Sequence, residues 1–172
     1  MNEVISCLVS RRSCKKYQKT QIDEAQLQEI LTAGLYAPSG MGRQSPIFVV
    51  LQKEEDIRQL AQMNAAVRGS AGDPFYGAPT VVVVLADAKV PTCVEDGSVA
   101  ICNMLNAASS LGVGACWIHR ARQEFESEAG KALLQKWGIP SHYIGVGHCI
   151  LGNWEGTIPQ PAPRREGRIL RV

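Results

Sequence analysis

Residues 10–17 read Ser-Arg-Arg-Ser-Cys-Lys-Lys-Tyr, and a second distinctive stretch, Ala-Gly-Leu-Tyr-Ala-Pro-Ser-Gly-Met-Gly-Arg-Gln, occupies residues 33–44. The first stretch places the guanidinium groups of Arg11 and Arg12 beside the hydroxyl of Ser13. Arginine offers a planar fork of donors that suits phosphate, and serine adds a neutral donor. A glycine in the second stretch allows the backbone to approach a flat ligand closely. The two stretches therefore predict a site for a planar ligand that carries a phosphate.

The composition is that of an ordinary globular domain. The chain has 172 residues, of which 45% are hydrophobic and 20% charged, and its formal net charge is +2. This length fits a single domain over residues 1–172. The small net charge gives no general reason to expect nucleic acid as a partner, and no apolar run is long enough to span a bilayer. We therefore expect neither a nucleic-acid nor a membrane partner.

Six cysteines are scattered through the chain, without a Cys-x-x-Cys pair or a clustered His/Cys spacing. This distribution indicates reduced thiols in a cytoplasmic protein, and it does not predict a zinc site or an iron–sulfur cluster. The first residues also lack the charged and apolar regions of a secretory signal. We expect a cytoplasmic protein without a metal site, in which several cysteines are small core residues. The three histidines have no ligand spacing and are expected to be structural.

Helical and strand patterns alternate along the chain. Short apolar runs predict four strands, at residues 47–51, 81–85, 115–118 and 143–151. Helical periodicity predicts a short helix near the N-terminus and further helices around residues 23–36, 54–64, 96–111 and 124–137. This order predicts a layered α+β or α/β fold. The only glycine-rich run that could bind a dinucleotide, Gly112-Val113-Gly114, follows a helix and precedes a strand, which is the wrong order.

Several segments depart from regular periodicity. Residues 65–79 are rich in glycine, alanine and proline and predict a long loop of the kind that often forms a functional lid. Three prolines between residues 159 and 163 favour an extended strap, and the alternation in residues 168–172 predicts an edge strand. In the last long strand, Gly145 and Gly147 predict a β-bulge.

Four segments resemble the signatures of the nitroreductase family of flavoproteins. They are residues 10–17, residues 33–44 with the Phe-Val-Val strand that follows, the run from Asn106 to Ile118, and Pro163-Arg164-Arg165. Together they cover almost the whole chain in the family's order. The resemblance implies an α+β fold with a central, mostly antiparallel sheet flanked by helices. It also implies an interlocked homodimer that holds one FMN per subunit at the dimer interface.

The resemblance assigns roles to the cationic residues. Arg11 and Ser13 are expected to bind the phosphate and ribityl end of FMN, with Arg12 alongside. Lys15 is expected to face N1 and the C2 carbonyl of the flavin ring. Reduced flavin is anionic at that edge, so a cation there stabilises it and raises the potential. In the tail, Arg164 matches the C-terminal phosphate ligand and Arg165 is a neighbouring candidate.

Two further groups of residues are implied at the flavin ring. Pro38, Ser39 and Gly40 are expected to come from the other subunit and to lie against the ring. Trp117 and Ile118 are expected to offer backbone donors or apolar cover near its edge. These assignments divide one site between two subunits.

The chain departs from the family pattern at three positions. Gly42 stands where many relatives have asparagine, and Ser45 stands where they have proline. His119 occupies a position at which relatives often have glycine or an acidic residue. The chain is also short for the family, so little inserted material is available to shape a substrate pocket.

An FMN-dependent NAD(P)H oxidoreductase is the function that the resemblance implies. In a ping-pong cycle, NADH or NADPH gives a hydride to flavin N5 and leaves, and a nitroaromatic, a quinone or a similar small acceptor then takes the electrons. No catalytic protein nucleophile is expected, because the flavin carries the chemistry. The alternative is a non-catalytic module of the same fold that senses or stores flavin. Taken singly, Arg-Arg-Ser is typical of a surface turn and Ala-Pro-Ser-Gly of a helix stop, so the flavin interpretation depends on their occurrence together.

Overall fold

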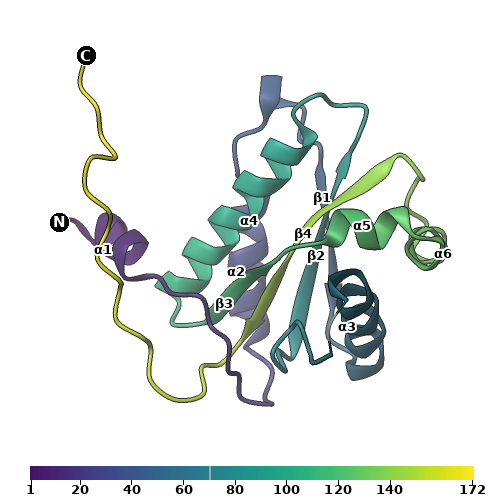
Figure 1. Ribbon diagram of the computed structural model, residues 1–172, viewed down its shortest axis with the longest axis horizontal. Helices are drawn as coiled ribbons and strands as arrows, with labels where there is room; N and C mark the ends of the chain where they lie inside the picture. Colours follow the sequence, from purple (N-terminus) through teal and green to yellow (C-terminus); the bar gives the residue numbers. More distant parts are fainter. Residues whose placement is uncertain (70) are drawn as a thin grey trace.

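A four-stranded antiparallel sheet forms the centre of the protein in a computed structural model that describes residues 1–69 and 71–172 (Figure 1). Its strands are β1 (Pro46–Leu51), β2 (Thr80–Asp87), β3 (Gly114–Ile118) and β4 (Tyr143–Gly152). They lie in the order β1-β2-β4-β3, and every adjacent pair is antiparallel. The four predicted strands are confirmed, and the antiparallel pairing makes the fold α+β rather than α/β.

Strand β2 is the most deeply buried strand. Its residues 80–86 are all buried, because β1 and β4 pair with its two edges and side chains cover both of its faces. This burial explains why β2 reads as a continuous apolar run rather than an alternating one. In β4, Gly145 and Gly147 pair with successive residues of β2, which leaves Val146 as the extra residue of a bulge. The predicted β-bulge is confirmed.

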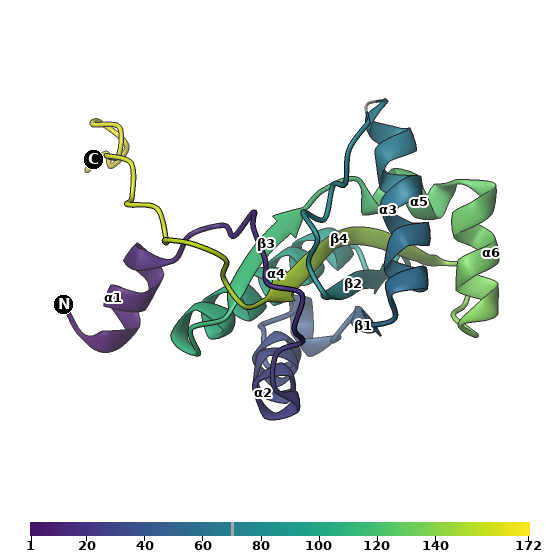
Figure 2. The same ribbon diagram turned by 90° about the horizontal axis from the view of Figure 1, so that it is seen from below.

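Helices α2 (Glu24–Leu35) and α4 (Cys93–Ser110) cover one face of the sheet (Figures 1 and 2). Gly34 of α2 lies so close to its neighbours that an added Cβ would stand 2.9 Å from Met104 and 3.0 Å from Phe48. A glycine at this point therefore lets α2 approach both α4 and the sheet. The long helix α4 consequently has a buried side along most of its length.

The opposite face is covered by α3 (Glu54–Arg68), α5 (Ala121–Glu126) and α6 (Glu128–Lys136) (Figure 2). Their buried side chains, which include Leu60 and Leu134, form a second core. None of the helices in the described part of the chain is both long and apolar enough to cross a membrane.

The prediction of one helix over residues 124–137 is wrong, since α5 and α6 are separate. Between them Ser127 has extended backbone angles, with φ −72° and ψ 160°. Its hydroxyl donates to the Glu124 carbonyl at 2.6 Å and accepts from the Gly130 backbone N–H at 3.1 Å. Ser127 thus acts as an N-cap for α6. An added Cβ on Gly130 would lie 2.0 Å from the Glu124 carbonyl oxygen, so only glycine permits this tight break.

The C-terminal tail extends away from the sheet and its helices, whereas the N-terminal helix contacts α4 (Figure 2). Helix α1 (Glu3–Ser10) has no buried residue, and its large apolar side chains are between 43% and 65% exposed: Val4, Ile5, Leu8 and Val9. Residues 155–172 are exposed throughout and contain no helix or strand, which confirms the extended strap. The predicted edge strand at residues 168–172 is wrong, because the tail leaves the sheet after Trp154 and pairs with no strand in the described residues.

Four of the six cysteines are buried: Cys14, Cys93, Cys116 and Cys149. All six are free thiols. Burial of the four confirms that they are small core residues, as their apolar neighbours in the sequence predicted.

Candidate functional site

The segment of residues 11–17 runs along the outer edge of β3. Ser13 pairs in parallel with Ala115, and the backbone N–H of the next residue donates to the Ala115 carbonyl at 2.9 Å. Further on, Tyr17 forms an antiparallel bridge with Trp154. The segment that carries most of the predicted phosphate ligands is therefore held to the sheet at both ends.

Three of the predicted ligands influence the thiol of Cys116 on β3. Burial raises the pKa of Cys116, while a hydrogen bond with Ser13 and the positive charges of Lys15 and Arg11 act to lower it. The net shift is upward, so the thiol stays neutral and does not neutralise the cations around it. The structure thus brings Arg11, Ser13 and Lys15 together at one edge of the sheet.

Arg12 lies in the same segment and has buried donors without an acceptor. Its Nη1 atom donates to the carbonyl of Val9 at 3.0 Å and to the carbonyl of Arg11. Its Nε and Nη2 atoms are buried and have no hydrogen-bond partner among the described residues. Buried donors of this kind destabilise a protein unless an acceptor meets them. A phosphate bound at this edge would supply the missing acceptor, so the residues present fit a phosphate-bearing ligand.

The loop after α3 brings an aromatic ring to Lys15. The Lys15 Nζ atom lies 5.8 Å from the centroid of the Tyr76 ring. Tyr76 sits in a tight turn at a φ of 56°, where the Asp73 carboxylate accepts from the backbone N–H groups of Phe75 at 2.8 Å and Gly77 at 2.6 Å. This loop also forms one wall of a groove of about 690 Å³ whose other wall is α3. The predicted loop at 65–79 begins later than expected, because α3 continues to residue 68.

The loop of residues 38–40 is anchored to the start of α4. The Gly40 backbone N–H donates to the Asp96 carboxylate at 2.9 Å, and the Ser45 hydroxyl donates to it at 2.7 Å. Burial of Asp96 acts to raise its pKa, but these hydrogen bonds and one from Thr92 hold the pKa below its usual value. Asp96 was not identified from the sequence, because a single aspartate near a helix start does not reveal which loop it holds.

The cationic segment and the loop of residues 38–40 lie at opposite ends of α4 (Figure 1). Asp96 holds the loop at the first turn of the helix, whereas the thiol of Cys7 donates to the Asn106 carbonyl near the last turn, at 3.6 Å. These two anchors are ten residues apart, which is about 15 Å along the helix. Within one chain, the two predicted halves of the site are therefore anchored at separate places along α4.

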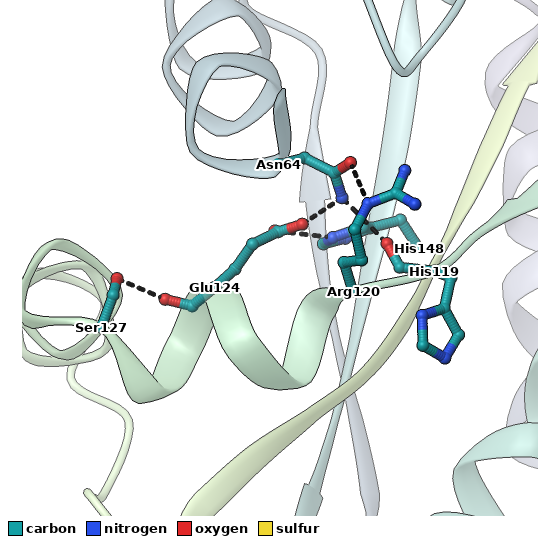
Figure 3. Close-up of polar contacts among 6 residues, drawn as sticks. All are labelled: Asn64, His119, Arg120, Glu124, Ser127 and His148. Atoms are coloured by element: carbon teal, nitrogen blue, oxygen red, sulfur yellow. Dashed lines mark hydrogen bonds and ion pairs between the residues drawn. The ribbon is translucent and has the colours of Figure 1, made fainter. Parts of the chain in front are cut away.

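A buried polar cluster lies just beyond the end of β3 (Figure 3). Glu124 and His148 are completely buried, and the Glu124 Oε2 and His148 Nε2 atoms are 2.8 Å apart. The amide of Asn64 donates to the Glu124 carboxylate and, at 2.9 Å, to the His119 carbonyl. The Nε atom of Arg120 donates to the Asn64 side-chain oxygen at 3.0 Å. His148 is thus a structural histidine, as predicted, but its partners were not foreseen.

Comparison with known proteins now identifies the family. The model of the nitroreductase family matches residues 8–153 of the chain. This chain belongs to the nitroreductase family. A crystal structure of a nitroreductase with bound FMN from Bacteroides fragilis is 30% identical and matches the whole of both chains with a TM-score of 0.92.

Two curated proteins resemble the chain over most of its length. One, from Archaeoglobus fulgidus, is named as a candidate NADH dehydrogenase/NAD(P)H nitroreductase and is 30% identical over 157 residues, which are 88% of this chain and 86% of the relative. The other, from Bacillus subtilis, is named FMN reductase [NAD(P)H] and is 25% identical in an alignment of 171 positions, gaps included, that covers 86% of this chain and 66% of the relative.

The remaining predicted site residues of this nitroreductase-family chain lie outside the cationic segment, on β3 and on the C-terminal tail. Ile118 is buried in the core, and the Trp117 indole packs so tightly on β4 that an added Cβ on Gly147 would lie 2.5 Å from its nitrogen. The Trp117 side chain is nevertheless only partly buried, so both it and the backbone of β3 are left to face a ligand at this point. Arg164 and Arg165 lie on the exposed tail, outside any helix or strand.

One departure from the nitroreductase-family pattern has a backbone explanation. Gly42 has a φ of 65°, and the space around an added Cβ is open. The left-handed region is favoured by glycine and is tolerated by asparagine better than by most residues. Glycine and asparagine at this position therefore suit the same turn.

Proposed function

We propose that the chain is an FMN-dependent NAD(P)H oxidoreductase that reduces a small acceptor such as a nitroaromatic or a quinone. The observation that carries the proposal is the edge of β3, where Arg11, Ser13 and Lys15 gather and where Arg12 has two buried donors without an acceptor. The similarity to an FMN-bound nitroreductase over the whole chain supports the same cofactor here. The names of the curated relatives support a nicotinamide nucleotide as the electron donor.

The residues of the cationic segment are proposed to bind different parts of FMN. Arg12 offers Nε and Nη2 to the phosphate, with Arg11 and the hydroxyl of Ser13 beside it. Lys15 lies further along the segment and places a positive charge at the pyrimidine edge of the ring. When bound, FMN supplies the redox chemistry by accepting a hydride from the nicotinamide and passing electrons to the acceptor. Tyr76, held against Lys15 by its turn, covers this edge and limits the entry of water and acceptor.

The complete site is proposed to form between two copies of the chain. Residues 38–40 are anchored at the first turn of α4, whereas the N-terminal segment of their own chain contacts α4 near its last turn, so a second copy is proposed to contribute them. The exposed apolar side chains of α1 and the extended tail of residues 155–172 are surfaces that such a dimer would cover. In that dimer Arg164 and Arg165 reach a phosphate that they do not reach within one chain.

Reduction of bound flavin by a nicotinamide nucleotide tests the proposed activity. Anaerobic mixing of the FMN-loaded protein with NADH or NADPH is expected to bleach the flavin absorption band, as followed by stopped-flow spectroscopy. Addition of a nitroaromatic or a quinone is then expected to restore the band. If neither nucleotide bleaches the flavin, the chain is a flavin-binding module and not an oxidoreductase. If the protein does not take up FMN, both functions are excluded.

The tail gives a second test, because its charged and apolar residues have separable roles. Changing Arg164 and Arg165 together to alanine is expected to weaken FMN binding and to leave the dimer intact, since only phosphate ligands are lost. Changing the exposed Ile169 and Leu170 together to serine is expected to weaken the dimer first, because apolar contact is lost. Fluorescence titration with FMN and light scattering during size exclusion measure the two effects. Wild-type FMN affinity in the double arginine variant contradicts the proposed role of the tail.

A further inference from the structure

Arg120 has a backbone conformation that arginine rarely adopts. Its φ is 81° and its ψ is 0°, in the left-handed region, directly after the end of β3 and His119. For a residue with a Cβ this conformation is unfavourable, and it persists only where surrounding contacts hold it. Residues held in this way occur often at functional sites. The contacts of Arg120 therefore need an explanation.

The buried side-chain amide of Asn64 binds both the backbone before Arg120 and the side chain of Arg120 (Figure 3). Asn64 is completely buried and donates to the His119 carbonyl at 2.9 Å, which positions the peptide before Arg120. Its side-chain oxygen accepts from Arg120 Nε at 3.0 Å, which positions the guanidinium group. Glu124 and His148 lie behind it and orient the amide of Asn64. The protein thus uses a fully buried cluster to place a single arginine.

The outer end of that guanidinium group is available. Only its Nε atom is hydrogen-bonded within the described residues, so Nη1 and Nη2 are left without protein partners. No ion pair joins Arg120 to a carboxylate among the described residues, and the nearby Glu124 contacts Asn64 and His148 instead. The planar pair of free donors matches the oxygens of a carboxylate or a phosphate.

The position of Arg120 links it to the cationic edge of β3. Lys15 is two residues beyond Ser13, which pairs in parallel with Ala115, so Lys15 lies alongside Trp117. Arg120 follows Trp117 by three residues, which is at most about 10 Å of extended chain. The two cations therefore border the same end of β3.

The loop that covers Lys15 also contacts the cluster behind Arg120. Phe75, the neighbour of Tyr76, packs edge-on against His148 with ring centroids 5.4 Å apart. His148 in turn contacts Glu124 at 2.8 Å. Lys15, Tyr76 and Arg120 are thus connected through one continuous set of contacts.

We propose that Arg120 is a specificity-determining residue that binds an anionic group of a molecule exchanging electrons at this site. The inference rests on the proposed function, which supplies two sources of such a group. One is the phosphate of the nicotinamide nucleotide, and the other is a carboxylate on the acceptor. Both present oxygens that the two free nitrogens of Arg120 receive side by side.

The test compares Arg120→Gln with Arg122→Gln in the FMN-loaded protein. Arg122 is a matched control, because it lies on α5 two residues away and pairs with the exposed Glu126 at 2.8 Å. Titration calorimetry measures the binding of NAD+, NADP+, 4-nitrobenzoate and neutral nitrobenzene. Arg120→Gln is expected to weaken binding of the anion that it contacts about tenfold or more, as for the loss of a charged hydrogen bond. Nitrobenzene binding and all affinities of Arg122→Gln are expected to stay unchanged.

Each outcome of the titrations has one meaning. A loss confined to the two nucleotides assigns Arg120 to the nucleotide phosphate, and a loss confined to 4-nitrobenzoate assigns it to the acceptor. Wild-type affinities for all the anions in Arg120→Gln overturn the proposal. Arg120→Asn is a second variant in case Gln disturbs the turn, because asparagine tolerates the left-handed region better.

The same measurements separate this proposal from the proposed function. If the anions bind in an Arg120-dependent way but NADH and NADPH do not bleach the flavin, the anion site stands and the oxidoreductase proposal fails. In the opposite case, low concentrations of nucleotide bleach the flavin equally well in wild type and in Arg120→Gln, and 4-nitrobenzoate binding is also unchanged. That result supports the oxidoreductase proposal and contradicts the proposed role of Arg120.

Discussion

Replacing Glu124 with alanine is expected to lower the free energy of unfolding by about 2–4 kcal/mol, because it leaves buried polar groups without a hydrogen-bond partner. The carboxylate of Glu124 is completely buried and contacts both His148 and Asn64. Without it, the His148 Nε2 atom is left buried without its partner, and the Asn64 amide keeps only the His119 carbonyl as an acceptor. Urea-induced unfolding, followed by circular dichroism at saturating FMN, measures the loss.

Glu126 provides the control, because it lies on the same helix two residues further on. Its side chain is 54% exposed, and its ion pair with Arg122, at 2.8 Å, faces solvent. Glu126→Ala is therefore expected to cost less than about 1 kcal/mol. Glu124→Gln is expected to fall between the two, because an amide keeps the shape and one acceptor oxygen. Equal losses for Glu124→Ala and Glu126→Ala would show that the buried cluster does not contribute to stability.

The strands and their order of appearance could be predicted because they depend on local pattern. The continuous apolar run at β2 indicated burial on both faces, and the glycines at 145 and 147 indicated the bulge. The break at Ser127 could not be predicted in the same way, since it depends on how closely Gly130 packs on the carbonyl of Glu124. Helical periodicity continues through that point, so the sequence favoured one helix.

The cationic segment could be predicted from the sequence, whereas the buried polar cluster could not. Arg11, Ser13 and Lys15 are neighbours in sequence, so their common position on one edge follows from local structure. Asn64 and Glu124 are 60 residues apart on different helices, and polar helix residues are usually exposed. Nothing in either segment by itself indicates that the two meet in the core.

The left-handed turn at Arg120 was missed for a related reason. Glycine or asparagine in a loop would have indicated such a turn, but arginine gives no such signal. The conformation depends on Asn64, which comes from α3 and donates to the carbonyl of His119. Long-range hydrogen bonds of this kind decide the details of a site, whereas the local pattern decides only its frame.

Replacing Arg12 with alanine is expected to weaken FMN binding about 10- to 100-fold, which corresponds to the loss of one strong charged hydrogen bond. Arg12 Nε and Nη2 are buried without an acceptor, so a phosphate at this edge meets donors that no protein group competes for. Arg12→Lys is expected to recover part of the affinity, because lysine restores the charge but not the planar fork. Quenching of FMN fluorescence during titration of the apoprotein measures each dissociation constant.

Lys16 is the matched control for Arg12, since it carries the same charge in the same segment but points to solvent. Its side chain is 72% exposed and lies 3.5 Å from the Glu155 carboxylate. Lys16→Ala is expected to change FMN affinity less than about threefold, as for a screened surface charge. If Arg12→Ala and Lys16→Ala weaken FMN equally, the effect is general electrostatic attraction. If Arg12→Ala binds FMN as tightly as wild type, its buried donors do not meet the phosphate and the position of FMN along β3 must be different.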